Sequence, residues 1–234
     1  MILLLPLFPI ALAGVLLFIK ENNKSLLRGF AMAGAFFPFA LVLYFLFQFK
    51  HAGDGFRFYV EFPWISTLGI HYQAGMDGIN LVLCLLHALV SFAGVFLAVK
   101  TEKRLKEYLF FYLVLIGAMY GVFTSLNLFF LYFFYEFTLI PLYPMIGLWG
   151  SKNKEYGAMK LTLFITSGAV LGLFGILLLY KELGSFDVIV GAGFPRPDPG
   201  AVTALLRTDI QNHLAPFFLI GFGVIASLWQ LHSW

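Results

Sequence analysis

The chain has 234 residues, of which 61% are apolar, 19% aromatic and 12% charged, and its formal net charge is +3. Soluble globular chains carry about twice that charged fraction, so the composition excludes a water-covered exterior and indicates a protein surrounded by lipid. The net charge is small and the basic residues lie in short loops between apolar runs, which excludes a nucleic-acid partner.

Seven apolar segments have roughly the 20 residues that a helix needs to cross a bilayer. They cover residues 2–19, 26–49, 79–99, 108–126, 128–149, 157–180 and 214–234. Each is continuously apolar, whereas the strands of a membrane barrel alternate, so helices are favoured. The sequence therefore predicts an all-α membrane protein with six complete transmembrane helices and most of a seventh.

The stretch between the second and third apolar segments, residues 50–78, predicts a small β-hairpin. Short alternating aromatic runs at 56–62 and 70–73 flank Pro63 and Gly69. Such runs next to turn residues are typical of two short strands.

The third apolar segment carries three polar residues. Asp77 precedes it and is a candidate N-cap. Cys84 is the only cysteine, so an internal disulfide and a cysteine cluster for zinc or iron–sulfur are excluded, and we expect a small buried side chain. His87 lies in mid-segment, where it is either a hydrogen-bonded packing residue or a member of a proton relay.

The basic residues of the loops are unevenly distributed between the two sides. Nine lie in the loops 20–28, 100–107 and 150–156. The opposite loops, which include the hairpin and an irregular proline-rich stretch at 181–213, carry only five. The positive-inside rule therefore places the N-terminus outside and the hairpin on the outer face.

Two glycine pairs, Gly117 with Gly121 and Gly168 with Gly172, have the spacing that lets membrane helices approach closely. Glycine is also generally common in membrane helices, so the spacing leaves both interpretations open.

Glu136 is the one acidic residue of twelve that lies deep inside an apolar segment. Inserting an acidic side chain at that depth costs about 2.5–3.5 kcal/mol on translocon scales. Burial disfavours the charged form, so such a group can take and release a proton, as a relay requires. The alternative is a structural glutamate that is hydrogen-bonded to a neighbouring helix.

The neighbours of Glu136 favour the relay. Tyr132 and Tyr143 share its helix face at spacings of four and seven residues. Pro141 and Pro144 each lack a backbone N–H and free a carbonyl one turn back, where water can bind. Prolines also occur as simple helix kinks, so this feature supports the relay without deciding it.

Lys160 is the only basic residue inside an apolar segment. If it approaches Glu136, the two charges offset each other's insertion cost. The alternative is that its long side chain extends to the nearby membrane surface.

Three stretches resemble the antiporter-like membrane subunits of complex-I-type NADH:quinone oxidoreductases. They read Phe-Pro-Trp-Ile to Gly-Met-Asp-Gly-Ile at 62–79, Tyr-Glu-Phe-Thr-Leu-Ile-Pro-Leu-Tyr at 135–143, and Tyr-Gly-Ala-Met-Lys at 156–160. The resemblance covers essentially the whole chain and about the first half of a family chain. It implies an N-terminal three-helix segment at 1–107 and the first part of a proton-channel helix repeat at 108–234.

The resemblance also implies that Glu136 is the family's fifth-helix glutamate, coupled to a lysine on a broken seventh helix. This chain departs from that pattern, because Ile225 stands at the lysine position and Ser227 and Gln230 stand at two proline positions. His232 matches the family histidine, which makes Glu136, Lys160 and His232 the candidate proton relay.

The expected function is that of a proton-translocating membrane-arm subunit, or the N-terminal part of one, in a bacterial inner or plasma membrane. The implied partners are other membrane-arm subunits, the lipid bilayer and, indirectly, hydrophilic redox subunits. No nucleophile–base set, phosphate loop or metal-ligand spacing is present, so redox cofactors are expected only in the partners. Two alternatives stay open: a subunit of a Mrp-type cation/proton antiporter or membrane-bound hydrogenase, and a truncated remnant that transports nothing.

Overall fold

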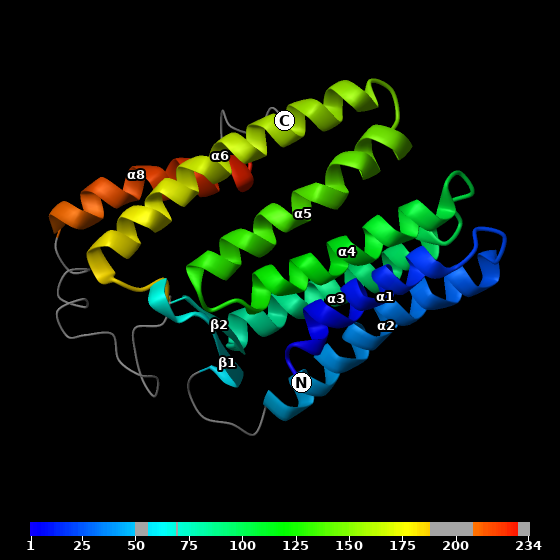
Figure 1. Ribbon diagram of the computed structural model, residues 1–234, viewed down its shortest axis with the longest axis horizontal. Coiled ribbons are helices and arrows are strands. Elements are labelled where there is room, and N and C mark those ends of the chain that lie inside the picture. Colours follow the sequence, from blue (N-terminus) through cyan, green and yellow to red (C-terminus); the bar gives the residue numbers. More distant parts are fainter. Residues whose placement is uncertain (50–55, 69, 188–207, 229–234) are drawn as a thin grey trace.

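The computed structural model describes residues 1–49, 56–68, 70–187 and 208–228. Its helices follow the apolar segments (Figure 1). They are α1 Leu4–Phe18, α2 Lys24–Phe49, α3 Gly78–Ala98, α4 Leu105–Thr124, α5 Leu128–Trp149, α6 Lys154–Leu183 and α8 Thr208–Ile225.

Five of the described helices, α2 to α6, are long and apolar enough to cross a membrane. The helix α1 has 15 residues. At 1.5 Å per residue its length is about 22 Å, which is less than the hydrocarbon core of roughly 30 Å. The multi-pass membrane architecture is thus confirmed, whereas the full count of six crossings and part of a seventh is not.

The helices pack around α4 in one half of the molecule and as a series of neighbours in the other half. The helix α4 contacts α1, α2, α3 and α5, while α5 packs on α6 and α6 packs on α8. In Figure 1, α6 and α8 form one side of the molecule and α1 and α2 the other. The loops that join α1 to α2, α3 to α4 and α5 to α6 lie together at one end, opposite the hairpin.

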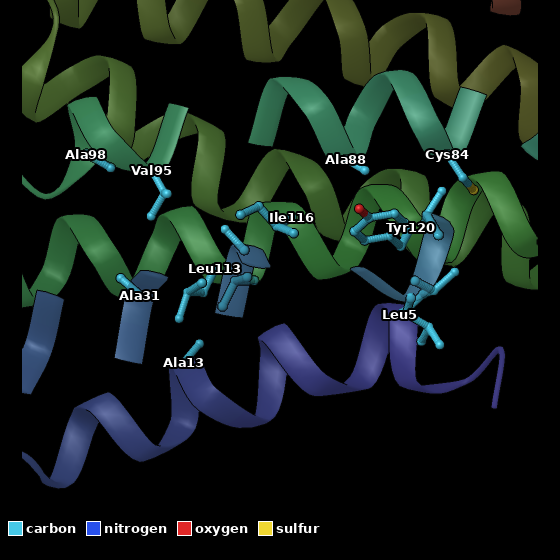
Figure 2. Packing of buried hydrophobic residues seen from close by; sticks show 14 of the residues in the cluster. Leu5, Ala13, Ala31, Cys84, Ala88, Val95, Ala98, Leu113, Ile116 and Tyr120 are labelled. Carbon is cyan, nitrogen blue, oxygen red and sulfur yellow. The ribbon is translucent and has the colours of Figure 1, made fainter. Parts of the chain in front are cut away.

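The largest buried cluster lies among α1, α2, α3 and α4 (Figure 2). Leu5, Leu113 and Tyr120 are fully buried there. Cys84 is also fully buried in this cluster, as its apolar surroundings predict. The same helices hold His87, whose Nε2 lies 3.1 Å from the carbonyl oxygen of Ile116, and this contact matches the packing interpretation.

Close helix approaches confirm the glycine spacing at two contacts. A side chain at Gly117 would meet the carbonyl oxygen of Pro6 on α1. A side chain at Gly168 would collide with Val224, and one at Gly221 would meet the backbone of Gly172. The backbones of α6 and α8 therefore lie nearly in contact, which larger residues would prevent.

The predicted hairpin is confirmed. Strand β1 Arg57–Ile65 pairs antiparallel with β2 Ile70–Met76, and the short 3-10 helix Ser66–Leu68 follows β1. The N-cap prediction is also confirmed, since the Asp77 side chain accepts a hydrogen bond of 2.7 Å from the backbone N–H of Asn80.

The hairpin is fastened to the ends of α5 and α6. The backbone N–H of Leu126 donates to the carbonyl of Gln73 at 2.9 Å, and the Tyr180 hydroxyl donates to the carbonyl of Leu68 at 3.0 Å. The Asn127 side chain donates to Asp187 at 2.9 Å just beyond α6. The first two bonds hold the hairpin against the start of α5 and the end of α6, and the third joins these two helix ends to each other.

The prediction for the last helix was wrong at both described boundaries. The stretch 181–213 was expected to be irregular and 214–234 helical, but α6 continues to Leu183 and α8 begins at Thr208. Asp209 in the first turn favours the earlier start, since a carboxylate stabilises a helix N-terminus. The helix ends at Ile225, inside the segment that was expected to be continuous.

The end of α8 is formed without proline. Ser227 has a left-handed backbone with φ 55°. The N–H of Ser227 donates to the carbonyl of Val224 at 3.2 Å, and that of Leu228 donates to the carbonyl of Gly223 at 2.9 Å. These two bonds are the Schellman pattern, which satisfies the last helical carbonyls and stops the helix. Position 227 is usually glycine in this pattern, so the sequence lacked the usual signal.

Candidate functional site

The site is centred on a carboxyl group within α5. Glu136 is half-buried and lies one turn after Tyr132, which shares its face of the helix. Its Oε1 is buried and has no hydrogen-bond partner among the described residues. A buried carboxyl oxygen without a partner is costly, and membrane proteins keep such groups mainly where they carry ions or protons.

A cavity of about 510 Å³ lies beside this carboxyl group. Its walls come from the hairpin end, α5, α6 and the segment after α6. They are Leu68, Ile70, Phe129, Tyr132, Phe133, Glu136, Leu173, Ile176, Leu177, Tyr180 and Phe186. Glu136 is thus the single ionisable carboxyl of an otherwise hydrocarbon and aromatic space.

The helix α5 continues through both prolines. Pro141 and Pro144 lie inside Leu128–Trp149, so the carbonyls of Phe137 and Ile140 lack their usual N–H partners. Both carbonyls lie within about one turn of Glu136. They add acceptors for water or a protonated group near the carboxyl.

The structure does not bring Lys160 to Glu136. Lys160 lies two residues after Ala158, which faces Gly147 of α5, and two residues turn a helix by about 200°. Its ammonium lies 5.9 Å from the centre of the Phe164 ring on its own helix. No ion pair joins Lys160 to Glu136 among the described side chains.

The two groups also lie at different depths. The cavity at Glu136 is lined by Leu173 of α6. Lys160 is 13 residues earlier on that helix, a separation of about 20 Å at 1.5 Å per residue.

Two of the departures from the family pattern, Ile225 and Ser227, lie at the end of α8. Ile225 is the last residue of the helix, and Ser227 forms the break just described. His232 lies outside the described residues. The sequence analysis did not predict that the helix ends at Ile225. Gly221 and Gly223, which lie just before this end, are residues that weaken a helix.

Among the described residues, no group of three or more His, Cys, Asp or Glu side chains has a geometry that would hold a metal ion. The ionisable side chains found inside the helices are instead single groups, of which Glu136 and His87 are two.

Comparison with known proteins identifies the family. The family described as "NADH:quinone oxidoreductase/Mrp antiporter, TM" matches residues 125–234, which include α5, α6 and α8. Over 233 residues the chain is 31% identical to NADH-quinone oxidoreductase subunit M of Rhodobacter capsulatus, covering 97% of this chain and 45% of the relative. The chain belongs to this family of antiporter-like membrane subunits.

Solved structures of similar fold include two respiratory complexes. A chain of respiratory complex I from Thermus thermophilus with bound NADH aligns with a TM-score of 0.82 at 23% identity, over 100% of this chain and 46% of that one. A chain of the membrane-bound sulfane sulfur reductase, an archaeal respiratory membrane complex, aligns at 0.80 and 22% over the same shares. At these identities the likeness shows the antiporter-like fold.

The chain spans somewhat less than half the length of the relatives it matches. Within the family, the matched region begins at Ser125, just before α5, and so contains Glu136 with its prolines. The carboxyl group, the cavity and the end of α8 therefore all lie in or beside the family's membrane segment.

Proposed function

We propose that this chain is a proton-translocating membrane-arm subunit, or the N-terminal part of one, of a complex-I-type NADH:quinone oxidoreductase. The observation that carries the proposal is the Glu136 carboxyl, which lies inside α5 beside Tyr132 and has one buried oxygen without a hydrogen-bond partner among the described residues. The match of residues 125–234 to the family "NADH:quinone oxidoreductase/Mrp antiporter, TM", which includes this helix, supports the proposal.

Glu136 would take up a proton and release it as its electrostatic surroundings change. The Tyr132 hydroxyl would hold the carboxyl in place, and the free carbonyls of Phe137 and Ile140 offer positions for water. Lys160 and His232 are the other proposed members of the relay. Redox energy would come from partner subunits, since we assign no redox cofactor to this chain.

The proposed setting follows from the same family. The partners are other membrane-arm subunits and, indirectly, hydrophilic redox subunits of a bacterial inner or plasma membrane. The helix α1 would make a sixth crossing and α8 would enter the membrane as part of a seventh. Residues 1–107 would form the N-terminal three-helix segment and 108–234 the first part of the proton-channel repeat, with the N-terminus outside.

The test is Glu136→Gln in the assembled complex. The amide keeps the shape but cannot titrate, so we expect NADH-driven proton uptake by inverted vesicles to fall strongly while the subunit is still inserted and assembled. Glu155→Gln is the matched control, because Glu155 is exposed in the first turn of α6. Wild-type uptake in an assembled Glu136→Gln complex would reject the proposal.

The family description also names Mrp antiporters, which favours one second candidate: a cation/proton antiporter subunit, or a subunit of a related membrane-bound hydrogenase. An antiporter exchanges protons for sodium without NADH. Proton uptake that requires a sodium gradient and not NADH would favour this candidate. A remnant that transports nothing would instead show no effect of Glu136→Gln in either assay.

A further inference from the structure

The ring of Phe134 on α5 lies in a notch that Gly121 leaves in the surface of α4. A side-chain carbon at Gly121 would overlap three atoms of this ring, Cγ, Cδ1 and Cε1. Phe134 is only 8% exposed, so the contact is buried. Because Cγ does not move when the ring turns about χ2, a larger residue at position 121 would force χ1 of Phe134 or the backbone of α5 to shift.

The hairpin holds the same ring from another side. Tyr72 of β2 lies edge-on to Phe134, with the ring centroids 6.2 Å apart, and edge-on to Phe130 at 4.7 Å. Phe133 on the same helix lies edge-on to Phe134 at 5.6 Å. Edge-to-face aromatic pairs at such distances are favourable. The Phe134 ring is therefore bounded by α4, by the hairpin and by its own helix, which leaves little space for another rotamer.

This contact determines which way Glu136 faces. Phe134, Thr138 and Pro141 are buried residues whose spacing puts them on one face of α5, and the contact with Gly121 turns that face towards α4. Two residues turn a helix by about 200°, so Glu136 points to nearly the opposite side. That side borders the cavity, whose wall includes Leu173 and Ile176 of α6.

The outer half of α5 needs its own contacts to fix its rotation. Pro141 and Pro144 each remove one backbone hydrogen bond from the helix on the inner side of Glu136. The inner half of α5 therefore restrains the outer half less than it would in an unbroken helix. Among the buried side chains of α5, Phe134 is the largest and lies two residues from Glu136.

We propose that Phe134, held in the notch at Gly121, is a positioning residue that turns the Glu136 carboxyl towards α6 and the cavity. A residue larger than glycine at position 121 displaces Phe134, and the displaced helix carries Glu136 away from the cavity wall. The importance of this orientation for proton transfer rests on the proposed function of Glu136, whereas the orientation itself does not.

Labelling with dicyclohexylcarbodiimide tests this orientation. The reagent dissolves in membranes and adds to carboxyl groups in apolar surroundings, which gives a stable N-acylurea. The assembled complex in its membrane is treated with the reagent and digested, and the adduct at Glu136 is quantified by mass spectrometry against the unmodified peptide. The carboxyl borders a cavity of about 510 Å³, where the reagent can reach it, so we expect Gly121→Ala to lower the labelling rate several-fold.

Gly117→Ala is the matched control on the same helix. A side chain at Gly117 would meet the carbonyl oxygen of Pro6 and the side chain of Ile10 on α1, so this variant also crowds α4 but leaves the contact with α5 intact. General damage to the packing of α4 would change the labelling of Glu136 in both variants. Positioning through Phe134 changes it only in Gly121→Ala.

Phe134→Ala removes the ring without crowding α4, and it decides the question if Gly121→Ala does not assemble. We expect a several-fold fall in the labelling of Glu136, whereas Phe174→Ala, which removes an exposed ring from α6, should leave it unchanged. Wild-type labelling in an assembled Gly121→Ala or Phe134→Ala complex would reject the positioning role, and so would an equal fall in Gly117→Ala. Labelling needs no turnover, so this failure is distinguishable from wild-type proton uptake in Glu136→Gln, which rejects the proposed function alone.

Discussion

At the scale of single residues, the burial of Glu136 costs stability, and we attribute its presence to the proposed proton transfer. One of its carboxylate oxygens is buried without a partner, which costs about 1–3 kcal/mol or more for a charged group. The spacing of four residues was enough to predict that Tyr132 lies beside it, because a helix places such pairs on one face. The direction of Lys160 was not predictable in the same way, since it depends on which side of α6 packs against α5.

Tyr132→Phe tests the role of the hydroxyl. The change removes the hydroxyl group nearest to Glu136 on this helix face while it keeps the ring in the cavity wall. We expect NADH-driven proton uptake to fall, but less than in Glu136→Gln. Tyr143→Phe is the control, since Tyr143 shares this helix face but is 49% exposed. Equal losses in both tyrosine variants would contradict a specific role for Tyr132.

At the scale of elements, five of the helices could be predicted because their apolar segments end at capping residues or in charged loops. The core of α5 was fully predictable, since the segment 128–149 coincides with Leu128–Trp149. The end of α8 was not, because hydropathy continues across Ser227 while the backbone turns left-handed there. Hydropathy records burial in lipid, and it does not record where a helix stops.

Ser227 allows a test of how α8 ends, because a change to glycine should stabilise this turn, whereas glycine usually destabilises a helix. A non-glycine residue in the left-handed region costs about 1–2 kcal/mol, so Ser227→Gly should slow hydrogen–deuterium exchange of the peptide spanning 222–228. The β-branched change Ser227→Val should speed it. Ser167→Gly is the matched control inside α6, where glycine costs about 1 kcal/mol and should speed local exchange. Slower exchange in Ser227→Val than in Ser227→Gly would show that α8 does not end at this turn.

At the scale of the whole molecule, successive helices run in opposite directions, so the loops lie in two groups at opposite ends (Figure 1). The three loops with nine basic residues gather at one end and the hairpin lies at the other (Figure 1). The fold makes the two ends distinct, but the direction across the membrane depends on charge alone. An excess of Lys and Arg in short loops keeps them on the cytoplasmic side, so the hairpin end should face outward.

Cysteine labelling of intact cells measures that direction. Ser151 lies in the loop between α5 and α6, and Thr67 lies in the hairpin connection at the other end; both are exposed. Cys84 is fully buried, so it contributes little background. We expect a membrane-impermeant maleimide to label Thr67→Cys in intact cells, and Ser151→Cys only after the cells are opened. Labelling of Ser151→Cys from outside, with Thr67→Cys protected, would reverse the topology. It would then place the hairpin on the cytoplasmic side, without changing the depth at which α5 holds Glu136.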